Sequence, residues 1–413
     1  MCDRYKILLY ENHNLSEKEI ITFIMDRFVY ADNAATTPVA PEVLDAILPC
    51  LKDVYGNPSS IYSKGAEAAE ILNDARERIA AVLGCKNKEI YFTASGSEAD
   101  NWAIKGAARA YIKKGKHLIT TKFEHHAVIN AMKSLEKEGF EVTYLDVNHD
   151  GQLTADDVRK AIRPDTTLIA VMYANNEIGS ILPIKEIAQV AREHKILCFT
   201  DAVQAVGSIP VNVKDLGVDI LAMSGHKINA PKGIGVLYIR SGVRITNLID
   251  GGGQENNKRG GTENVAYING LAKAIELADE RLPDMARIQQ MRDRLIAGIL
   301  KIPYTRLNGG IDNRLPGNVN VTFEFIEGES LLLWLDMNGI CASTGSACSS
   351  NSLDPSHVLL AIGVPVEVAH GSLRFSLSHQ NTDEDVDYIL EKLPPIVEKL
   401  RAMSPLYEKI GGK

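Results

Sequence analysis

Seven short apolar runs alternate with amphipathic helical patterns between residues 89 and 240, and this alternation restricts the fold more than any other feature. The apolar runs cover residues 89–94, 117–122, 141–147, 167–174, 196–200, 220–223 and 235–240, and the helical patterns cover about 97–114, 126–138, 154–163 and 183–195. Continuous apolar runs of this length are typical of strands buried on both faces, and strands that alternate with helices form parallel sheets. The sequence therefore predicts an α/β fold with a seven-stranded, mostly parallel sheet.

The pattern changes after a Gly-rich segment at residues 250–264. Helices are predicted at about 264–281, 285–300 and 328–338, strands near 319–323 and 372–377, and a final amphipathic helix from about 382. This mixture indicates a smaller α+β domain, and 413 residues are enough for two domains. We expect a large domain over residues 29–282, whose first few residues join the small domain, and a small C-terminal domain over 283–413.

Residues 1–28 form an N-terminal extension outside this pattern. They contain a four-residue apolar core and several acidic groups, which is typical neither of a secretory signal nor of a transit peptide. The Asn-Leu-Ser-Glu stretch at residues 14–17 could cap a short helix that ends near Arg27. Alternatively, the natural chain starts at Met25 and the preceding residues are an upstream extension.

The composition restricts the partners and the compartment. A net charge of −8 and a pI near 5.8 argue against a nucleic-acid or anionic-membrane surface. No apolar run approaches the roughly 20 residues of a membrane span. The six cysteines show no C-x-x-C spacing, which argues against a zinc knuckle or a disulfide framework. A reducing, cytoplasmic location fits best.

Two residues at the ends of neighbouring predicted strands suggest a cofactor. Asp201 follows the fifth apolar run, and Lys227 ends a polar turn after the sixth. Side chains at such strand ends project into the crevice where open α/β sheets bind ligands. Pyridoxal phosphate (PLP) requires an activated lysine amine and an acidic partner that keeps its pyridine nitrogen protonated. A turn-capping aspartate and a surface lysine would look the same individually, but the pair together with Gln204, Ser224 and His226 favours PLP.

A candidate phosphate site lies between a predicted strand and a predicted helix. Ser95, Gly96 and Ser97 occupy this junction, where free amide groups and the helix dipole attract anions. The pairs Ser95–Glu98 and Ser97–Asp100 also have capping-box spacing, so a capped helix without a ligand has the same pattern. In a chain that binds PLP, we expect the phosphate here.

Two further polar pairs follow predicted strands. Either His125 or His126 could lie flat on the cofactor ring and move protons, or could bond the backbone at a helix start. Metal binding is not expected, because adjacent histidines diverge and no third ligand is evident. Asn175 and Asn176 could hold a ring oxygen or a substrate carboxylate, or could stabilise a turn.

The small domain contributes a thiol and a guanidinium. Cys348 lies in a run of small and polar residues with too little apolar content to bury, so its thiol is expected to be exposed, as a nucleophile requires. An incidental loop cysteine would look the same. Arg374 lies inside an apolar strand, where a charge is costly unless it is paired. It is suited to bidentate capture of a carboxylate or to a structural salt bridge.

Together these motifs resemble those of cysteine desulfurases in the class V aminotransferase family, the group that serves nitrogenase maturation and iron–sulfur cluster assembly. The resemblance covers about residues 30–406 and rests on DNAATTPV, GNPSS, EHHAV, NNEIG, DAVQAVG, SGHKINAPKGIG, RGGTENV, STGSACSS and LRFSLS. It implies fold type I of the PLP-dependent transferases, a homodimer, and removal of sulfur from L-cysteine to give L-alanine and an enzyme persulfide. The sulfur would then pass to an iron–sulfur scaffold protein or another acceptor, such as a tRNA thiolation pathway.

The resemblance also implies a role for each matched residue. Lys227 binds PLP covalently and moves protons, His125 stacks on the ring, and Cys348 attacks the substrate sulfur. The other cofactor-binding residues are Asp201 at the pyridine nitrogen, Gln204 and Asn176 near the ring hydroxyl, Gly96, Ser97, Ser224 and His226 at the phosphate, and Thr262, which reaches the phosphate of the partner subunit. Arg374 and Asn176 hold the substrate carboxylate. The chain departs from the family where Asn229-Ala230 replaces the common aromatic-Gly pair after the lysine.

Two other classes of function fit parts of the pattern. Another class V PLP enzyme, a selenocysteine lyase or an aminotransferase, would share the cofactor site. An aminotransferase has no use for an exposed thiol at Cys348, whereas selenocysteine lyase activity often accompanies desulfurase chemistry. A non-enzymatic scaffold would have lost the chemistry, and the retention of Lys227, Asp201, His125 and Cys348 argues against it.

Overall fold

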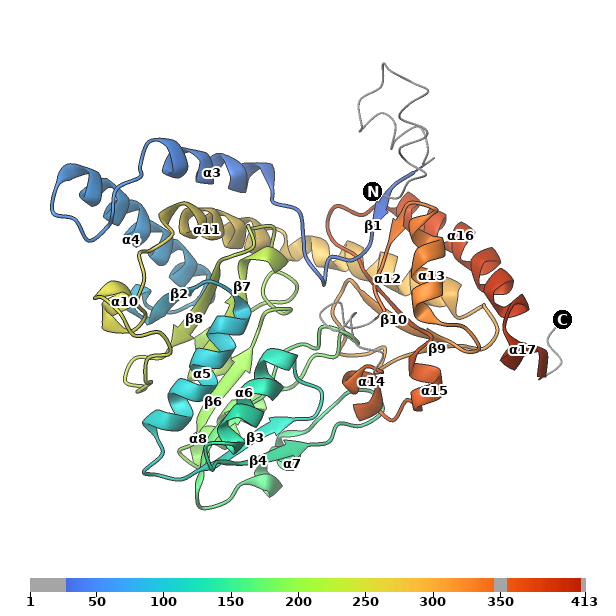
Figure 1. The fold of residues 1–413 in the computed structure, drawn as a ribbon, viewed down its shortest axis with the longest axis horizontal. Coiled ribbons are helices and arrows are strands. Elements are labelled where there is room, and N and C mark those ends of the chain that lie inside the picture. Colours follow the sequence, from blue (N-terminus) through green and yellow to red (C-terminus); the bar gives the residue numbers. More distant parts are fainter. Residues whose placement is uncertain (1–26, 345–354, 410–413) are drawn as a thin grey trace.

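The computed structural model describes residues 27–344 and 355–409, and its central element is the predicted seven-stranded sheet (Figure 1). Its strands are β2 (Ile90–Thr93), β3 (His117–Thr121), β4 (Glu141–Leu145), β5 (Thr166–Ala170), β6 (Leu197–Asp201), β7 (Ile220–Ser224) and β8 (Gly235–Ile239). Their order is β2-β8-β7-β6-β5-β3-β4, and within this sheet β8 alone runs antiparallel to its neighbours. The predicted fold class is confirmed.

Alternate residues of the strands supply two hydrophobic cores on opposite faces of the sheet. In β3, Leu118 packs with α5 (Gly96–Ala110) and α6 (His126–Glu136), which lie in front of the sheet in Figure 1. Ile119 belongs instead to the core formed with α3, α4, α8 and α11. Strands covered on both faces need apolar residues at every position, which explains the continuous apolar runs. The remaining helices of this part are α3 (Pro41–Lys52), α4 (Ser63–Leu83), α7 (Ala155–Ala161), α8 (Ile184–Glu193), α9 (Val213–Leu216), α10 (Gln254–Asn257) and α11 (Val265–Glu280).

The smaller C-terminal part is built on an antiparallel sheet of order β12-β10-β9. Its strands are β9 (Thr305–Leu307), β10 (Asn318–Phe323) and β12 (Ser372–Ser376), and its helices are α12 (Met285–Ile299), α13 (Gly328–Asp336), α14 (His357–Ala361), α15 (Val366–Ala369), α16 (Asp383–Ala402) and α17 (Pro405–Lys409). Its own core brings together Val319, Leu335, Phe375 and Leu393. The chain enters this part after α11, and the boundary near residue 282 is the domain division that we propose.

The first described residues pair with strands of this smaller part. β1 (Val29–Tyr30) pairs in parallel with β11 (Ile340–Cys341), and Asp32 forms an isolated bridge with Ser376. The strands β9 and β11 and the helix α15 were not predicted, because they are only two to four residues long and carry no measurable periodicity. The helix suggested for residues 14–27 lies almost wholly outside the described residues.

Among the described helices, none is both long enough and apolar enough to cross a lipid bilayer.

The packing of α11 on α3 gives a test of the fold. A Cβ added at Gly270 would lie 2.6 Å from Cγ1 and 2.7 Å from Cδ1 of Ile47, which is buried. Overpacking at such a contact costs about 1–3 kcal/mol, more than the roughly 1 kcal/mol that alanine gains over glycine inside a helix. We therefore expect Gly270→Ala to lower the free energy of unfolding, measured by urea denaturation. Asp279→Ala, at an exposed position of the same helix, is the control, and a more stable Gly270→Ala variant would contradict this packing.

Candidate active site

One cavity at the carboxyl ends of β5, β6 and β7 gathers most of the predicted site residues. Lys227, Asp201, Gln204, His125, Gly96, Ser97, Asn176, Ser224, His226 and Arg374 all line it. Arg374 comes from β12, so the smaller part of the molecule closes one side of the cavity. Thr262 does not line it, and Cys348 lies outside the described residues.

The carboxylate and the amine lie at the ends of two adjacent parallel strands. Asp201 ends β6, is 4% exposed, and accepts a hydrogen bond from the amide of Val203 at 2.9 Å. Burial raises the pKa of this carboxyl to about 6, although the Val203 amide and the Lys227 amine oppose the shift. Lys227 follows β7 on a short 3₁₀ turn, and its Nζ donates to the carbonyl oxygens of Ala34 at 2.5 Å and Ala35 at 2.8 Å.

The start of α5 forms the predicted anion-binding end of the cavity. The Ser95 hydroxyl caps the helix by accepting from the Glu98 amide at 3.1 Å, while the Glu98 carboxylate accepts from the Ala94 amide. The first amides of a helix have no partners within it, so those of Gly96 and Ser97 are available for an anion. The suggested Ser97–Asp100 cap is wrong as a capping pair, because α5 begins at Gly96 and Asp100 is buried on its inner side.

His125 caps a helix and also lines the cavity. It is the N-cap of α6, its Nδ1 accepts from the Ala127 amide at 3.1 Å, and it also lines the cavity. Because Nδ1 accepts, the imidazole carries its proton on Nε2. Burial, aided by the charge of Lys227, lowers the pKa of His125 to about 4, so the ring is neutral near pH 7. Burial and Lys227 also lower the pKa of His226 to about 4.

Asn175 stabilises a turn, whereas Asn176 lines the cavity. The Asn175 side chain donates to the Phe123 carbonyl at 2.9 Å and accepts from the Glu177 amide at 2.8 Å, which fixes the turn. Asn176 lines the cavity, and its Oδ1 is buried without a hydrogen-bond partner in the described part of the chain. A buried acceptor of this kind suggests that a ligand completes the site.

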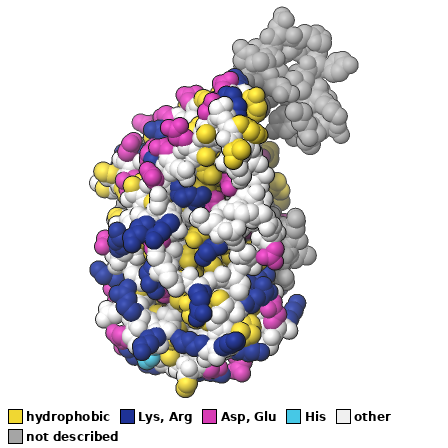
Figure 2. All heavy atoms as spheres, turned by 90° about the vertical axis from the view of Figure 1, so that its left-hand side faces the viewer, with side chains coloured by type: hydrophobic (Ala, Val, Ile, Leu, Met, Phe, Trp, Pro, Cys, Tyr) yellow, Lys and Arg dark blue, Asp and Glu magenta, His cyan; other side chains and the backbone are white. Residues whose placement is uncertain are grey.

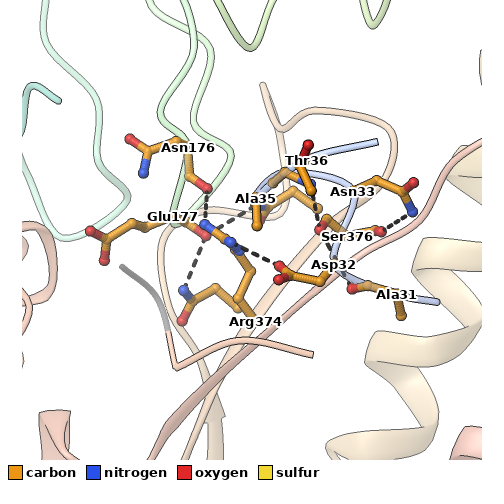
Figure 3. Close-up of polar contacts among 12 residues, drawn as sticks. Ala31, Asp32, Asn33, Ala35, Thr36, Asn176, Glu177, Arg374 and Ser376 are labelled. Carbon is orange, nitrogen blue, oxygen red and sulfur yellow. Dashed lines mark hydrogen bonds and ion pairs between the residues drawn. The ribbon is translucent and has the colours of Figure 1, made fainter. Parts of the chain in front are cut away.

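Arg374 is both paired and placed for a ligand. Its guanidinium lies between the Asp32 carboxylate, at 3.0 Å, and the Asn176 carbonyl, at 2.8 Å (Figure 3). The residue is 1% exposed, so this ion pair offsets the cost of burying the charge. Burial raises the pKa of Asp32, and Arg374 opposes that shift. Arg374 therefore forms a structural salt bridge with Asp32 and also lines the cavity.

Thr262 lies in an exposed loop and does not line the cavity. Two bidentate pairs anchor this loop, Arg76 with Glu255 at 2.8 and 2.9 Å and Arg259 with Glu98 at 2.9 and 3.2 Å. The three consecutive residues 255–257 have φ values of 48°, 55° and 62°, a left-handed turn that is strained for non-glycine residues. The two ion pairs stabilise this strained turn and fix the position of the loop.

Sequence reasoning missed three buried carboxyl groups near the cavity. Asp100 lines it, is 1% exposed, and has an Oδ1 with no partner among the described residues. Burial, followed by repulsion from Asp201 and Glu124, raises the pKa of Asp100 well above its usual value. Burial also raises the pKa of Glu124 to about 8 and that of Glu177 above its ordinary value. A charged residue on the apolar side of a predicted helix was the available signal for Asp100.

A second missed group lies at the start of α14. The His357 ring packs on His126 with centroids 4.5 Å apart, and its Nε2 lies 2.8 Å from the Glu124 carbonyl oxygen. The Ser356 hydroxyl donates to the Glu177 carboxylate. Both His126 and His357 line the cavity. The hydrogen bonds from α14 therefore attach this helix of the smaller part to the wall of the large part.

The chain is similar to known proteins over most of its length. The family model "Aminotransferase class-V" matches residues 29–389. "Cysteine desulfurase IscS" of Methanosarcina thermophila is 56% identical over 398 residues, which are 96% of this chain and 98% of that protein. Among solved structures, a "NifS-like protein" has a TM-score of 0.86 and 38% identity, covering 91% of this chain and 100% of that one. "SspA in complex with cysteine" has a TM-score of 0.76 and 39% identity, covering 84% and 98%.

The fold and the cavity define a PLP-dependent transferase of fold type I. The chain belongs to the class V aminotransferase family and, within it, to the cysteine desulfurases.

The residues of the cavity fit PLP, the cofactor of this family. A buried carboxylate lies at a strand end, an amine lies on the adjacent strand end, and helix amides lie at the anion end. At that end a Cβ on Gly96 would lie 2.9 Å from Val203 Cγ2 and 3.2 Å from Ser224 Cβ, so glycine permits the close packing. The Oδ1 of Asn176 adds an acceptor that has no partner among residues 27–344 and 355–409.

The buried Asp100 predicts a pH-dependent stability. Its folded pKa is raised, so the folded protein retains a proton that the unfolded chain releases above about pH 4, and stability falls as the pH rises toward the folded pKa. Asparagine does not titrate. We therefore expect Asp100→Asn to gain stability relative to wild type as the pH rises above about 4, by at most about 1.4 kcal/mol per pH unit. Urea denaturation of the cofactor-free protein measures this difference.

The exposed Asp279→Asn variant is the control, and its stability should follow that of wild type across this pH range. A parallel pH profile for Asp100→Asn and wild type would show that Asp100 is ionised in the folded protein.

Proposed function

We propose that the chain removes sulfur from L-cysteine, gives L-alanine, and retains the sulfur as a persulfide on Cys348. The observation that carries this proposal is the joint placement of Asp201, Lys227 and Arg374 around one cavity. Asp201 would pair with the protonated ring nitrogen of PLP, Lys227 would bind the cofactor, and Arg374 would bind the substrate. Gln204 and His125 would contact the ring, as their places in the cavity wall allow.

The substrate carboxylate fits between the two parts of the molecule. Arg374 offers a buried guanidinium, and Asn176 offers a side-chain amide beside it. A planar guanidinium suits a carboxylate because two parallel hydrogen bonds can form. The 39% identical solved structure described as a complex with cysteine supports an amino acid of this size as the substrate.

Two residues of the cavity, Lys227 and His125, would handle protons. When bound, PLP supplies the electron sink that makes the Cα proton of the substrate acidic. Lys227 Nζ would take this proton, and its two carbonyl partners would hold the resulting ammonium group. His125 is neutral near pH 7 and presents an Nε2–H, so it would donate a hydrogen bond without adding charge.

Cys348 would complete the reaction. Its thiolate attacks Sγ of the substrate, an S–S bond forms as the Cβ–Sγ bond breaks, and Cβ takes a proton, so the products are alanine and the persulfide. The described cysteines are unsuited to this role, because Cys50 and Cys198 are buried and burial raises the pKa of Cys85 to about 12. Burial also raises the pKa of Cys341. We propose that an iron–sulfur scaffold protein or another sulfur acceptor then takes the sulfur.

A homodimer would complete the phosphate site. Thr262 projects on an anchored loop outside its own cavity, so we propose that it reaches the phosphate of the partner subunit. Exposed apolar side chains support this, and they concentrate in one stretch: Val39, Leu44, Leu51, Tyr55, Ile61 and Tyr62. Figure 2, which views the end of the molecule that carries α3, α4 and α10, shows hydrophobic side chains between groups of lysine and arginine. A large exposed apolar patch is typical of a protein interface.

Substitution of the nucleophile tests the proposed reaction. We expect Cys348→Ala to retain the visible absorbance of bound PLP and its change on addition of L-cysteine, but to lose sulfide and alanine release by at least about 100-fold, because no thiol accepts the sulfur. Cys341→Ala is the matched control and should turn over normally. Wild-type turnover in Cys348→Ala would overturn the persulfide assignment, whereas a PLP absorbance that does not respond to L-cysteine would favour an aminotransferase.

The dimer has its own test. We expect the double variant Tyr55→Asp, Ile61→Asp to elute as a monomer of 45.2 kDa in size exclusion with light scattering, because two charges cannot be buried at an apolar interface. Leu333→Asp with Met337→Asp changes two equally exposed apolar residues of the smaller part and should leave the dimer intact. A wild-type protein that elutes as a monomer would contradict the proposed homodimer.

A further inference from the structure

A short segment, residues 31–40, spans the two parts of the molecule beside the cavity, and we name it the strap. Its first residues are bonded to β12: the Ser376 amide donates to the Ala31 carbonyl at 2.7 Å, and the Ala34 amide donates to the Ser376 hydroxyl at 2.8 Å. Its last residues are bonded to the large part, because the Thr37 amide donates to the His226 carbonyl at 3.0 Å. The strap is therefore bonded both to the smaller part of the molecule and to the turn that carries Lys227.

The middle of the strap contacts the amine directly. The carbonyl oxygens of Ala34 and Ala35 accept from Lys227 Nζ, and the Ala34 oxygen also accepts from Gln204 Nε2 at 3.0 Å. Ala34, Gln204 and Lys227 line two cavities, the active-site cavity and a second one toward α12. The position of these carbonyls thus decides where the lysine amine can be held.

Asn229 joins the strap to the lysine turn through both its backbone and its side chain. Its amide donates to the Thr37 hydroxyl at 2.9 Å, its carbonyl accepts from the Ala40 amide at 3.0 Å, and its Nδ2 donates to the Pro38 carbonyl at 2.9 Å. The residue is 7% exposed and has a φ of 66°. Asparagine tolerates this left-handed conformation better than other non-glycine residues.

We propose that Asn229 is a positioning residue for Lys227: its side chain fixes the strap so that the Ala34 and Ala35 carbonyls receive the amine whenever it is not bonded to the cofactor. This rests on the proposed role of Lys227. Beside the electrostatic attraction of Asp201, an ammonium group in this partly enclosed cavity needs hydrogen-bond acceptors, and the Ala34 and Ala35 carbonyls supply two of them. The backbone bonds of residue 229 do not depend on its side chain, so the bond to Pro38 is the contribution that asparagine adds.

The variant Asn229→Gly isolates that bond, because glycine accepts a positive φ without strain. Asn313→Gly is the matched control: Asn313 also has a positive φ, of 48°, but is exposed in the smaller part, where its backbone carbonyl receives the Ile181 amide. In the cofactor-free protein, we expect amide hydrogen exchange in residues 31–40, followed by mass spectrometry, to be about fivefold faster in Asn229→Gly and unchanged in Asn313→Gly.

Kinetics then separate positioning from a purely structural role. With PLP bound, kcat of Asn229→Gly should fall about fivefold while KM for L-cysteine stays within twofold, because Arg374 and Asn176 are untouched. Faster exchange with an unchanged kcat, or unchanged exchange, would overturn the proposal. Lys227→Ala distinguishes a failure of the proposed function: if this variant still bonds PLP covalently, the assignment of the lysine is wrong whatever Asn229→Gly does.

Discussion

The placement of one buried carboxylate determines much of this structure. Asp201 is buried at the end of β6, where an isolated negative charge is costly. The protein offsets this cost with the amide of Val203 and with the positive charge of Lys227 on the adjacent strand end. This arrangement requires two parallel neighbours whose carboxyl ends meet at one edge. The seven-stranded sheet and the two cores that cover its faces supply that edge.

The second requirement is a rigid connection between the two parts of the molecule. Arg374 belongs to β12, whereas Lys227 follows β7, so the groups that we assign to substrate and cofactor come from different sheets. The strap joins these sheets, since Asp32 pairs with Arg374 and the Ala34 carbonyl accepts from Lys227. Arg374 and Lys227 are therefore both bonded to the strap, which is itself bonded to both parts of the molecule.

The sequence was sufficient for the seven-stranded sheet, the longer helices and most of the residues that line the cavity. Regular periodicity predicted the sheet, and polar residues at strand ends predicted Asp201, Lys227 and Asn176 because carboxyl ends of parallel strands converge. The sequence could not show the Asp32–Arg374 pair, since it joins residues 342 positions apart. Asp100 was marked only by its place on the apolar side of a predicted helix, which is a weak signal because a single polar residue in a helix also fits a solvated face.

The buried carboxyl groups Asp100, Glu124 and Asp201 have a consequence for the amount of protein that persists in a cell. Burial raises the pKa of all three, so an ionised Asp201 lowers the stability of the cofactor-free fold. A cationic ring nitrogen beside Asp201 would offset part of that cost, and a ligand that binds only the folded chain stabilises it by mass action. The folded fraction, and with it the resistance to proteolysis, should therefore rise with the supply of the vitamin from which the cofactor is made.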